Sequence, residues 1–160
     1  MRDLVPRTAR WFWLLAWLAL LGLLTLYFSR QFQPEVTARG ELSLPRDPAG
    51  HYRLEGAING QPVQLMLDTG ATRVTLPKAV AQRLGITSYG QQQVSTAGGP
   101  VTVGMGRIEK LEMGPLTLYD LAVFINPADP GQTVLVGMNA IGKLEMVQRG
   151  QRLLLRPLQE

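Results

Sequence analysis

Apolar and polar positions alternate along most of the chain after Gly50, and this pattern predicts β-strands. Alternating stretches flank Asn59-Gly60, the strongest short signal for a tight hairpin. The returning half of this hairpin, from Val63 to Leu67, ends directly on Asp68. Further strands are expected at residues 73–76, 91–96, 101–111, 116–125 and 133–136, and a last hairpin turning at residues 149–151.

Two short segments among these strands have helical character. Residues 77–85 carry Pro near the first position and Gly just past the end, which is typical of helix boundaries. Residues 137–142 predict a single helical turn. Many short strands with one or two short helices predict an all-β fold, for which a small closed barrel is the natural class.

A long apolar segment without charges runs from Trp11 to Phe28. As a helix it would extend about 27 Å, close to the roughly 30 Å of a bilayer's hydrocarbon core. Aromatic residues stand at both ends, and preceding arginines predict an N-terminus, residues 1–10, in the cytoplasm. A cleaved signal peptide is the alternative, but residues 25–29 offer no small-x-small cleavage pattern. We therefore expect a single-pass transmembrane anchor over residues 11–28 in the inner (cytoplasmic) membrane.

Residues 29–48 are rich in Gln, Pro, Arg and Glu and lack a sustained apolar period. We expect them to tether a domain of residues 49–160 that lies in the periplasm or outside the cell. The whole chain of 160 residues has a net charge of +4, but its basic residues are scattered singly, which argues against nucleic-acid binding. It contains no cysteine, which excludes disulfides and Cys-based metal or redox sites. His51, the one histidine, is interpreted as a plain exposed residue, and the sequence calls for no metal or organic cofactor.

Asp68 is the most informative residue for function, because an apolar strand delivers it into the turn Asp68-Thr69-Gly70. Two carboxylates within hydrogen-bonding distance cannot both ionise cheaply, so such a pair keeps one proton and offers an acid and a base together. That combination suits peptide hydrolysis by water without a Ser, Cys or His nucleophile. Each of the other aspartates lacks a following Thr/Ser-Gly. If the chemistry uses a pair of such carboxylates, the second Asp68 has to come from a second subunit.

The chain resembles the retropepsin-like (retroviral-type) aspartic proteases, in a membrane-anchored bacterial branch. The resemblance rests on residues 67–72, on the glycine-rich turn at residues 96–99 and on residues 134–139, in that order. It covers about residues 50–156. It implies a small closed acid-protease barrel, a homodimer in which Asp68 is catalytic, and a peptide or protein as substrate.

The resemblance also implies roles for the neighbouring residues. The active-site loop continues through Thr69, Gly70, Ala71 and Thr72, with the Thr69 hydroxyl tying two loops together across the dimer axis. A flap that closes over the substrate is expected at Thr96, Ala97, Gly98 and Gly99. Val136 and Gly137 are expected to support the floor beside Asp68.

Two other functions stay open at this point. The chain could be a catalytically silent relative that binds peptides or scaffolds an envelope complex, or an unrelated β-barrel binding domain in which Asp68 caps a turn. The intact Asp68-Thr69-Gly70 favours catalysis over both. The C-terminal Leu153-Leu154-Leu155 could pair with a second subunit or within its own chain.

Overall fold

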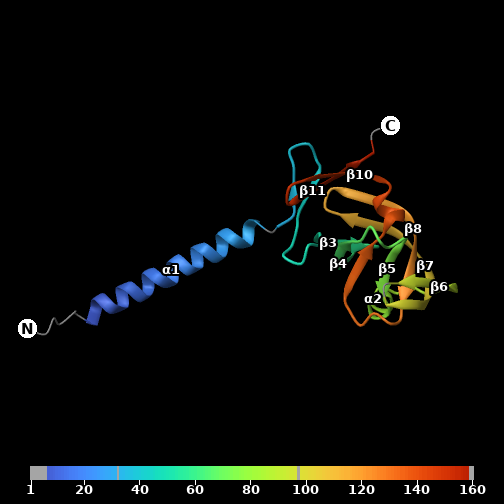
Figure 1. The fold of residues 1–160 in the computed structure, drawn as a ribbon, viewed down its shortest axis with the longest axis horizontal. Coiled ribbons are helices and arrows are strands. Elements are labelled where there is room, and N and C mark those ends of the chain that lie inside the picture. The colour runs from blue at the N-terminus through green and yellow to red at the C-terminus, as the bar shows by residue number, and fades with distance from the viewer. Residues whose placement is uncertain (1–6, 32, 97, 159–160) are drawn as a thin grey trace, which may run out of the picture. The chain divides into compact units, whose positions relative to one another are not determined.

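The computed structural model describes residues 7–31, 33–96 and 98–158, and the chain divides into two compact units, Met1–Gln33 and Pro34–Glu160. The first unit contains one helix, α1 (Arg7–Gln31) (Figure 1). Its segment Trp11–Ser29 is long and apolar enough to cross a membrane, and it overlaps the predicted anchor. A signal sequence near an N-terminus would have the same length and composition.

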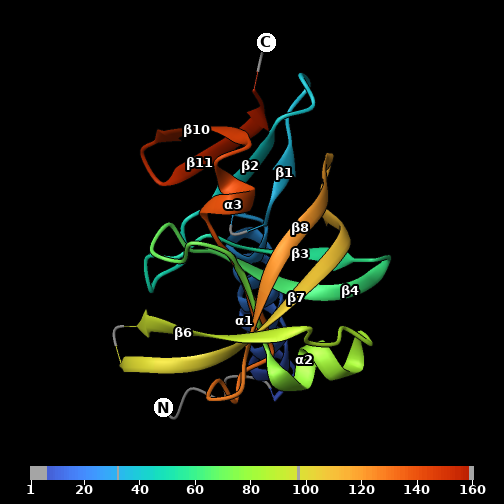
Figure 2. The same ribbon diagram turned by 90° about the vertical axis from the view of Figure 1, so that its right-hand side faces the viewer.

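The second unit is built mainly from strands, as predicted, with two short helices among its described residues (Figures 1 and 2). Its elements in chain order are β1 (Glu35–Val36), β2 (Leu42–Pro45), β3 (Arg53–Ile58), β4 (Gln61–Leu67), β5 (Val74–Pro77), α2 (Lys78–Arg83), β6 (Gly90–Thr96), β7 (Gly99–Met113), β8 (Leu116–Asn126), β9 (Thr133–Val136), α3 (Met138–Ile141), β10 (Leu144–Arg149) and β11 (Arg152–Pro157). Every strand and both helical segments expected from the sequence pattern after Gly50 are confirmed, with small differences at their ends.

The strands form two sheets, so the prediction of one small closed barrel is wrong. The larger sheet has the order β3-β4-β9-β5-β8-β7-β6, and a short additional pairing joins β3 to β7. The smaller sheet has the order β1-β2-β11-β10. Figure 2 shows the smaller sheet at one end of the unit and the β6–β7 hairpin at the other. Alternation along a strand specifies its buried face but not its neighbours, which is why the pattern could not predict this division.

Part of the predicted tether, residues 29–48, belongs to the folded unit. All residues of β2 are buried, and β2 pairs antiparallel with residues 152–155 of β11. The run is too short to show an apolar period, so its sequence does not distinguish it from a linker. β11 also pairs with β10, so Leu153-Leu154-Leu155 pairs on both sides within its own chain.

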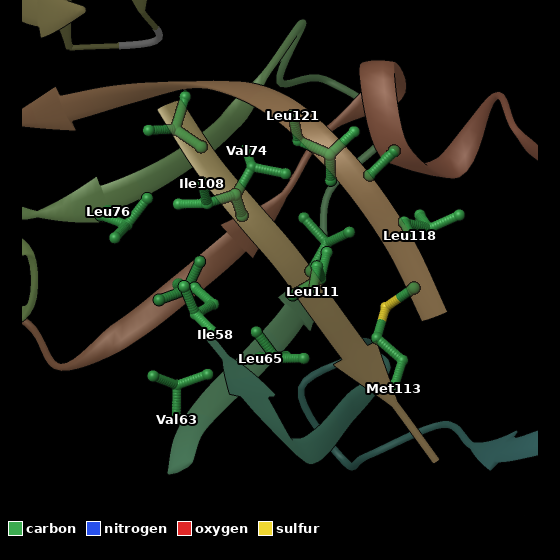
Figure 3. Close-up of a cluster of buried hydrophobic side chains, with 14 of the residues drawn as sticks. Ile58, Val63, Leu65, Val74, Leu76, Ile108, Leu111, Met113, Leu118 and Leu121 are labelled. Atoms are coloured by element: carbon green, nitrogen blue, oxygen red, sulfur yellow. The ribbon is translucent and has the colours of Figure 1, made fainter. Parts of the chain in front are cut away.

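The hydrophobic core is formed by side chains from both sheets and from α2 and α3. Leu65 of β4, Val74 of β5 and Ile108 of β7 are fully buried and point toward one another (Figure 3). The hairpin that carries Leu65 turns at Asn59 and Gly60, whose φ angles of 51° and 78° suit the primed turns of tight hairpins. This packing fixes the direction in which β4 delivers the residue that follows it.

Candidate active site

Asp68 lies at the point where β4 ends beside its parallel neighbour β9. Leu67 and Val136 are register partners, and the Asp68 backbone N–H donates to the Val136 carbonyl at 3.0 Å. The Gly70 backbone N–H donates to Asp68 Oδ1 at 2.8 Å. The side chain is half-buried. The backbone of the Asp68-Thr69-Gly70 turn therefore holds one carboxylate oxygen, and the Asp68 side chain keeps contact with solvent.

Gly137 gives this loop the room it needs. A Cβ at Gly137 would lie 2.4 Å from the Arg73 carbonyl oxygen and 2.7 Å from the Ala71 carbonyl oxygen. The next backbone N–H, of Met138, donates to the Ala71 carbonyl at 2.8 Å. Val136 and Gly137 are buried directly behind the loop that carries Asp68, which is the place that a supporting role requires.

Asn139 ties three elements together behind the same loop. Its Oδ1 accepts a hydrogen bond from the Val74 backbone N–H at 2.9 Å, and its Nδ2 donates to the Ala122 carbonyl at 2.8 Å. Its own backbone N–H donates to the Thr72 carbonyl at 3.1 Å. The sequence analysis included Asn139 in the motif of residues 134–139 but did not predict these hydrogen bonds. The sequence shows an amide side chain in an otherwise apolar turn, but it does not show which groups that side chain hydrogen-bonds to.

A cavity of about 630 Å³ opens next to Asp68 and contains most of the predicted site residues. Its lining includes Asp68, Gly70, Ala71, Thr72, Thr96 and Gly98. Apolar side chains from the β6–β7 hairpin and from the larger sheet complete the walls: Val94, Val101, Val103, Phe124 and Leu135. Thr96 and Gly98 therefore reach the same space as the Asp68 loop, although the two segments lie far apart in sequence.

The remaining predicted residues have other positions. Gly99 closes the hairpin turn with a φ of 108°, and its carbonyl accepts a hydrogen bond from the Thr96 hydroxyl at 2.7 Å. Ala97 lies outside the described residues. Thr69 is exposed and lines a second cavity of about 320 Å³, which also touches Asp68.

The second cavity lies between the loop and the smaller sheet. It is lined by His51, Tyr52, Met146, Gln148 and Leu153 together with residues of the Asp68 loop. His51 is exposed there, as expected for a residue at the start of a strand. Asp68 thus faces two cavities, one under the β6–β7 hairpin and one beside β10. In the part of the chain that the structure describes, no three His, Cys, Asp or Glu side chains gather as a metal site would require.

Two curated relatives share sequence with this chain. An uncharacterized protein in the cobV 5′ region of Sinorhizobium sp is 26% identical over 111 residues, which is 68% of this chain and 48% of that protein. An uncharacterized protein of Rickettsia prowazekii (strain Madrid E) is 37% identical over 49 residues, 31% of this chain and 21% of that protein. The chain spans about half the length of the first relative and less of the second.

Two solved structures resemble the fold. The crystal structure of a retropepsin-like aspartic protease from Rickettsia conorii matches with a TM-score of 0.59 and 21% identity, over 72% of this chain and 89% of that one. The solution structure of the simian foamy virus (mac) protease has a TM-score of 0.43 and 17% identity, over 56% of this chain and 91% of that one. The first of these likenesses shows a retropepsin-like fold.

The family model of the gag-polyprotein putative aspartyl proteases matches residues 54–143. This range is more than half of the chain, and it contains the Asp68 loop, the β6–β7 hairpin and Gly137. The chain therefore belongs to the gag-polyprotein putative aspartyl protease family.

Proposed function

We propose that the protein is a membrane-anchored aspartic endopeptidase that hydrolyses peptide bonds as a homodimer. The observation that carries this proposal is the position of Asp68, held by the Gly70 N–H and open to a cavity under the β6–β7 hairpin. An extended peptide fits such a space, because its backbone can pair with a hairpin while alternate side chains enter the apolar walls.

In the proposed reaction, the two Asp68 carboxylates share one proton. The ionised member takes a proton from a water molecule between them, and the protonated member donates a hydrogen bond to the scissile carbonyl. Water then attacks the carbonyl carbon, and the amine leaves with a proton supplied by the pair. No covalent intermediate with the protein forms. The titration belongs to the pair and not to either residue.

A homodimer is required because each subunit contributes one Asp68. A two-fold axis would place Asp68 opposite its mate. The exposed Thr69 and the second cavity beside it offer a surface on which a second subunit could approach. Both edges of β11 are occupied within the chain, so an intersubunit sheet would have to use another strand, such as the edge strand β10.

We assign the remaining site residues within this proposal. Thr69, Gly70, Ala71 and Thr72 form the active-site loop, with Val136 and Gly137 as its support. The turn Thr96, Ala97, Gly98 and Gly99 is the flap, which closes over the peptide and excludes water. Two of these residues, Thr96 and Gly98, line the cavity next to Asp68, which supports this role.

The anchor completes the proposal. Residues 11–28 would cross the inner membrane once, with residues 1–10 in the cytoplasm and the protease unit in the periplasm or outside the cell. The length and composition of α1 support a membrane span, and the orientation rests on the arginines that precede residue 11. Tethering two subunits to one membrane raises their effective concentration and favours a weak dimer.

The test compares the full-length wild type with Asp68→Asn, both reconstituted in lipid vesicles, for cleavage of a peptide library from acidic to neutral pH. Asp120→Asn is the matched control, because Asp120 is exposed and pairs with Arg107 on the β7–β8 hairpin. We expect Asp68→Asn to abolish cleavage and Asp120→Asn to retain it. Equal cleavage by wild type and Asp68→Asn would refute the catalytic role and favour a silent peptide-binding module.

A further inference from the structure

Arg73 packs on Phe124, one of the residues that line the cavity holding Asp68. Its guanidinium carbon lies 4.9 Å from the centre of the Phe124 ring, which is a cation–π arrangement. Phe124 lines the cavity, and so does its register partner Thr75 on the neighbouring strand. Cross-strand partners point to the same face of a sheet. The Arg73 guanidinium therefore lies next to a side chain that forms one wall of this cavity, although Arg73 itself is not part of the lining.

Arg73 forms no ion pair with a described carboxylate, whereas Arg53 pairs with one carboxylate and Arg156 with two. Among the described residues that line the cavity, Asp68 is the one ionisable side chain. Arg73 is only half-buried. Its planar guanidinium lies over the Phe124 ring, and its fork of N–H donors matches the geometry of a carboxylate.

We propose that Arg73 is a specificity-determining residue that selects peptides carrying a carboxylate side chain close to the scissile bond. The inference rests on the proposed function. An extended peptide presents alternate side chains to the same wall, so one of them comes next to Phe124 and Arg73. Because a symmetric dimer has two such walls, the preference extends to both sides of the scissile bond.

The experiment starts from a peptide that the wild type cleaves in an Asp68-dependent manner. Each residue flanking the scissile bond is replaced in turn by Glu or by the neutral isostere Gln, and kcat/KM is measured for each pair. The wild type is expected to prefer Glu by about fivefold or more at one position on each side. The preference disappears below about pH 4, where the substrate carboxylate takes up a proton.

Variants then assign the preference to Arg73. Arg73→Gln is expected to bring the Glu/Gln ratio close to one, Arg73→Lys to retain part of it, and Arg73→Glu to favour a Lys-containing peptide over the Glu-containing one. Arg149→Gln removes the same charge from the exposed β10–β11 turn, and the ratio should not change. Because a ratio is compared, a general loss of activity in a variant does not obscure the result.

The outcomes separate this inference from the proposed function. Asp68-dependent cleavage with no Glu preference in the wild type, or with a preference that survives in Arg73→Gln, would overturn the role of Arg73 and leave the protease assignment standing. If Arg73→Gln fails to fold, the role of Arg73 is still tested by two measurements. These are the pH dependence of the Glu/Gln ratio in the wild type and the Glu/Gln ratio of Arg73→Lys. The absence of any Asp68-dependent cleavage would contradict both the proposed protease function and the role of Arg73.

Discussion

Replacement of Gly137 by alanine tests whether the loop that carries Asp68 depends on close backbone contact. The new Cβ would lie 2.4 Å from the Arg73 carbonyl oxygen, and real Cβ atoms essentially never approach below 3.0 Å. The loop or α3 must therefore move by at least about 0.6 Å, the difference between these distances. Overpacking of this kind costs about 1–3 kcal/mol of unfolding free energy.

The same displacement is expected to reduce activity. A misplacement of about 1 Å can cost on the order of 100-fold in rate, so we expect Gly137→Ala to lose about 10- to 100-fold in kcat/KM. Stability is measured by urea denaturation and activity with a peptide that the wild type cleaves.

A matched control separates lost stability from lost activity. Gly60→Ala places a side chain at a φ of 78° in open space on the β3–β4 turn. It should cost about 1–2 kcal/mol of stability through backbone strain alone and leave kcat/KM per folded molecule unchanged. If Gly137→Ala matched the wild type in both measurements, the argument that Gly137 sets the position of the Asp68 loop would be wrong.

Three further predictions concern the rest of the unit. Asn139→Leu leaves the Val74 N–H without its side-chain acceptor and should cost about 1–3 kcal/mol in urea denaturation. Leu44→Ala should lower the free energy of unfolding by about 2–5 kcal/mol, because Leu44 is fully buried. A change near zero would show that β2 belongs to the linker and not to the folded unit. Hydrogen bonding to Arg156 holds the pKa of Glu145 below its ordinary value, so this pair contributes stability above the unfolded-state pKa and loses it as the pH falls. Arg156→Leu should make the denaturation midpoint less dependent on pH in that acidic range.

Local features of this chain were readable from its sequence, because short-range rules determine them. The Asn59-Gly60 turn and the strand that ends on Asp68 follow from backbone preferences and a period of two. The strand β2 was hidden because its burial depends on β11, more than a hundred residues away in sequence. The division into two sheets depends on the same long-range pairing.

The candidate site shows the same limit. Asp68, Gly70 and Thr72 stand together in the sequence, and their motif was visible there. Asn139 stabilises the loop through hydrogen bonds to Val74 and Ala122, on two other strands, and such contacts leave no local pattern. The contact of Arg73 with Phe124 was hidden for the same reason, since β5 and β8 pair only in the folded chain.

The central claim is that one active site needs Asp68 from two subunits, and subunit mixing tests it most directly. Wild type and Asp68→Asn are co-reconstituted at equal amounts and constant total protein, and cleavage is compared with that of wild type alone. If subunits pair at random, about one quarter of the dimers contain two wild-type subunits. If only these dimers are active, about one quarter of the activity remains. A decline to about one half, as expected for subunits that each carry a complete active site, would contradict the account.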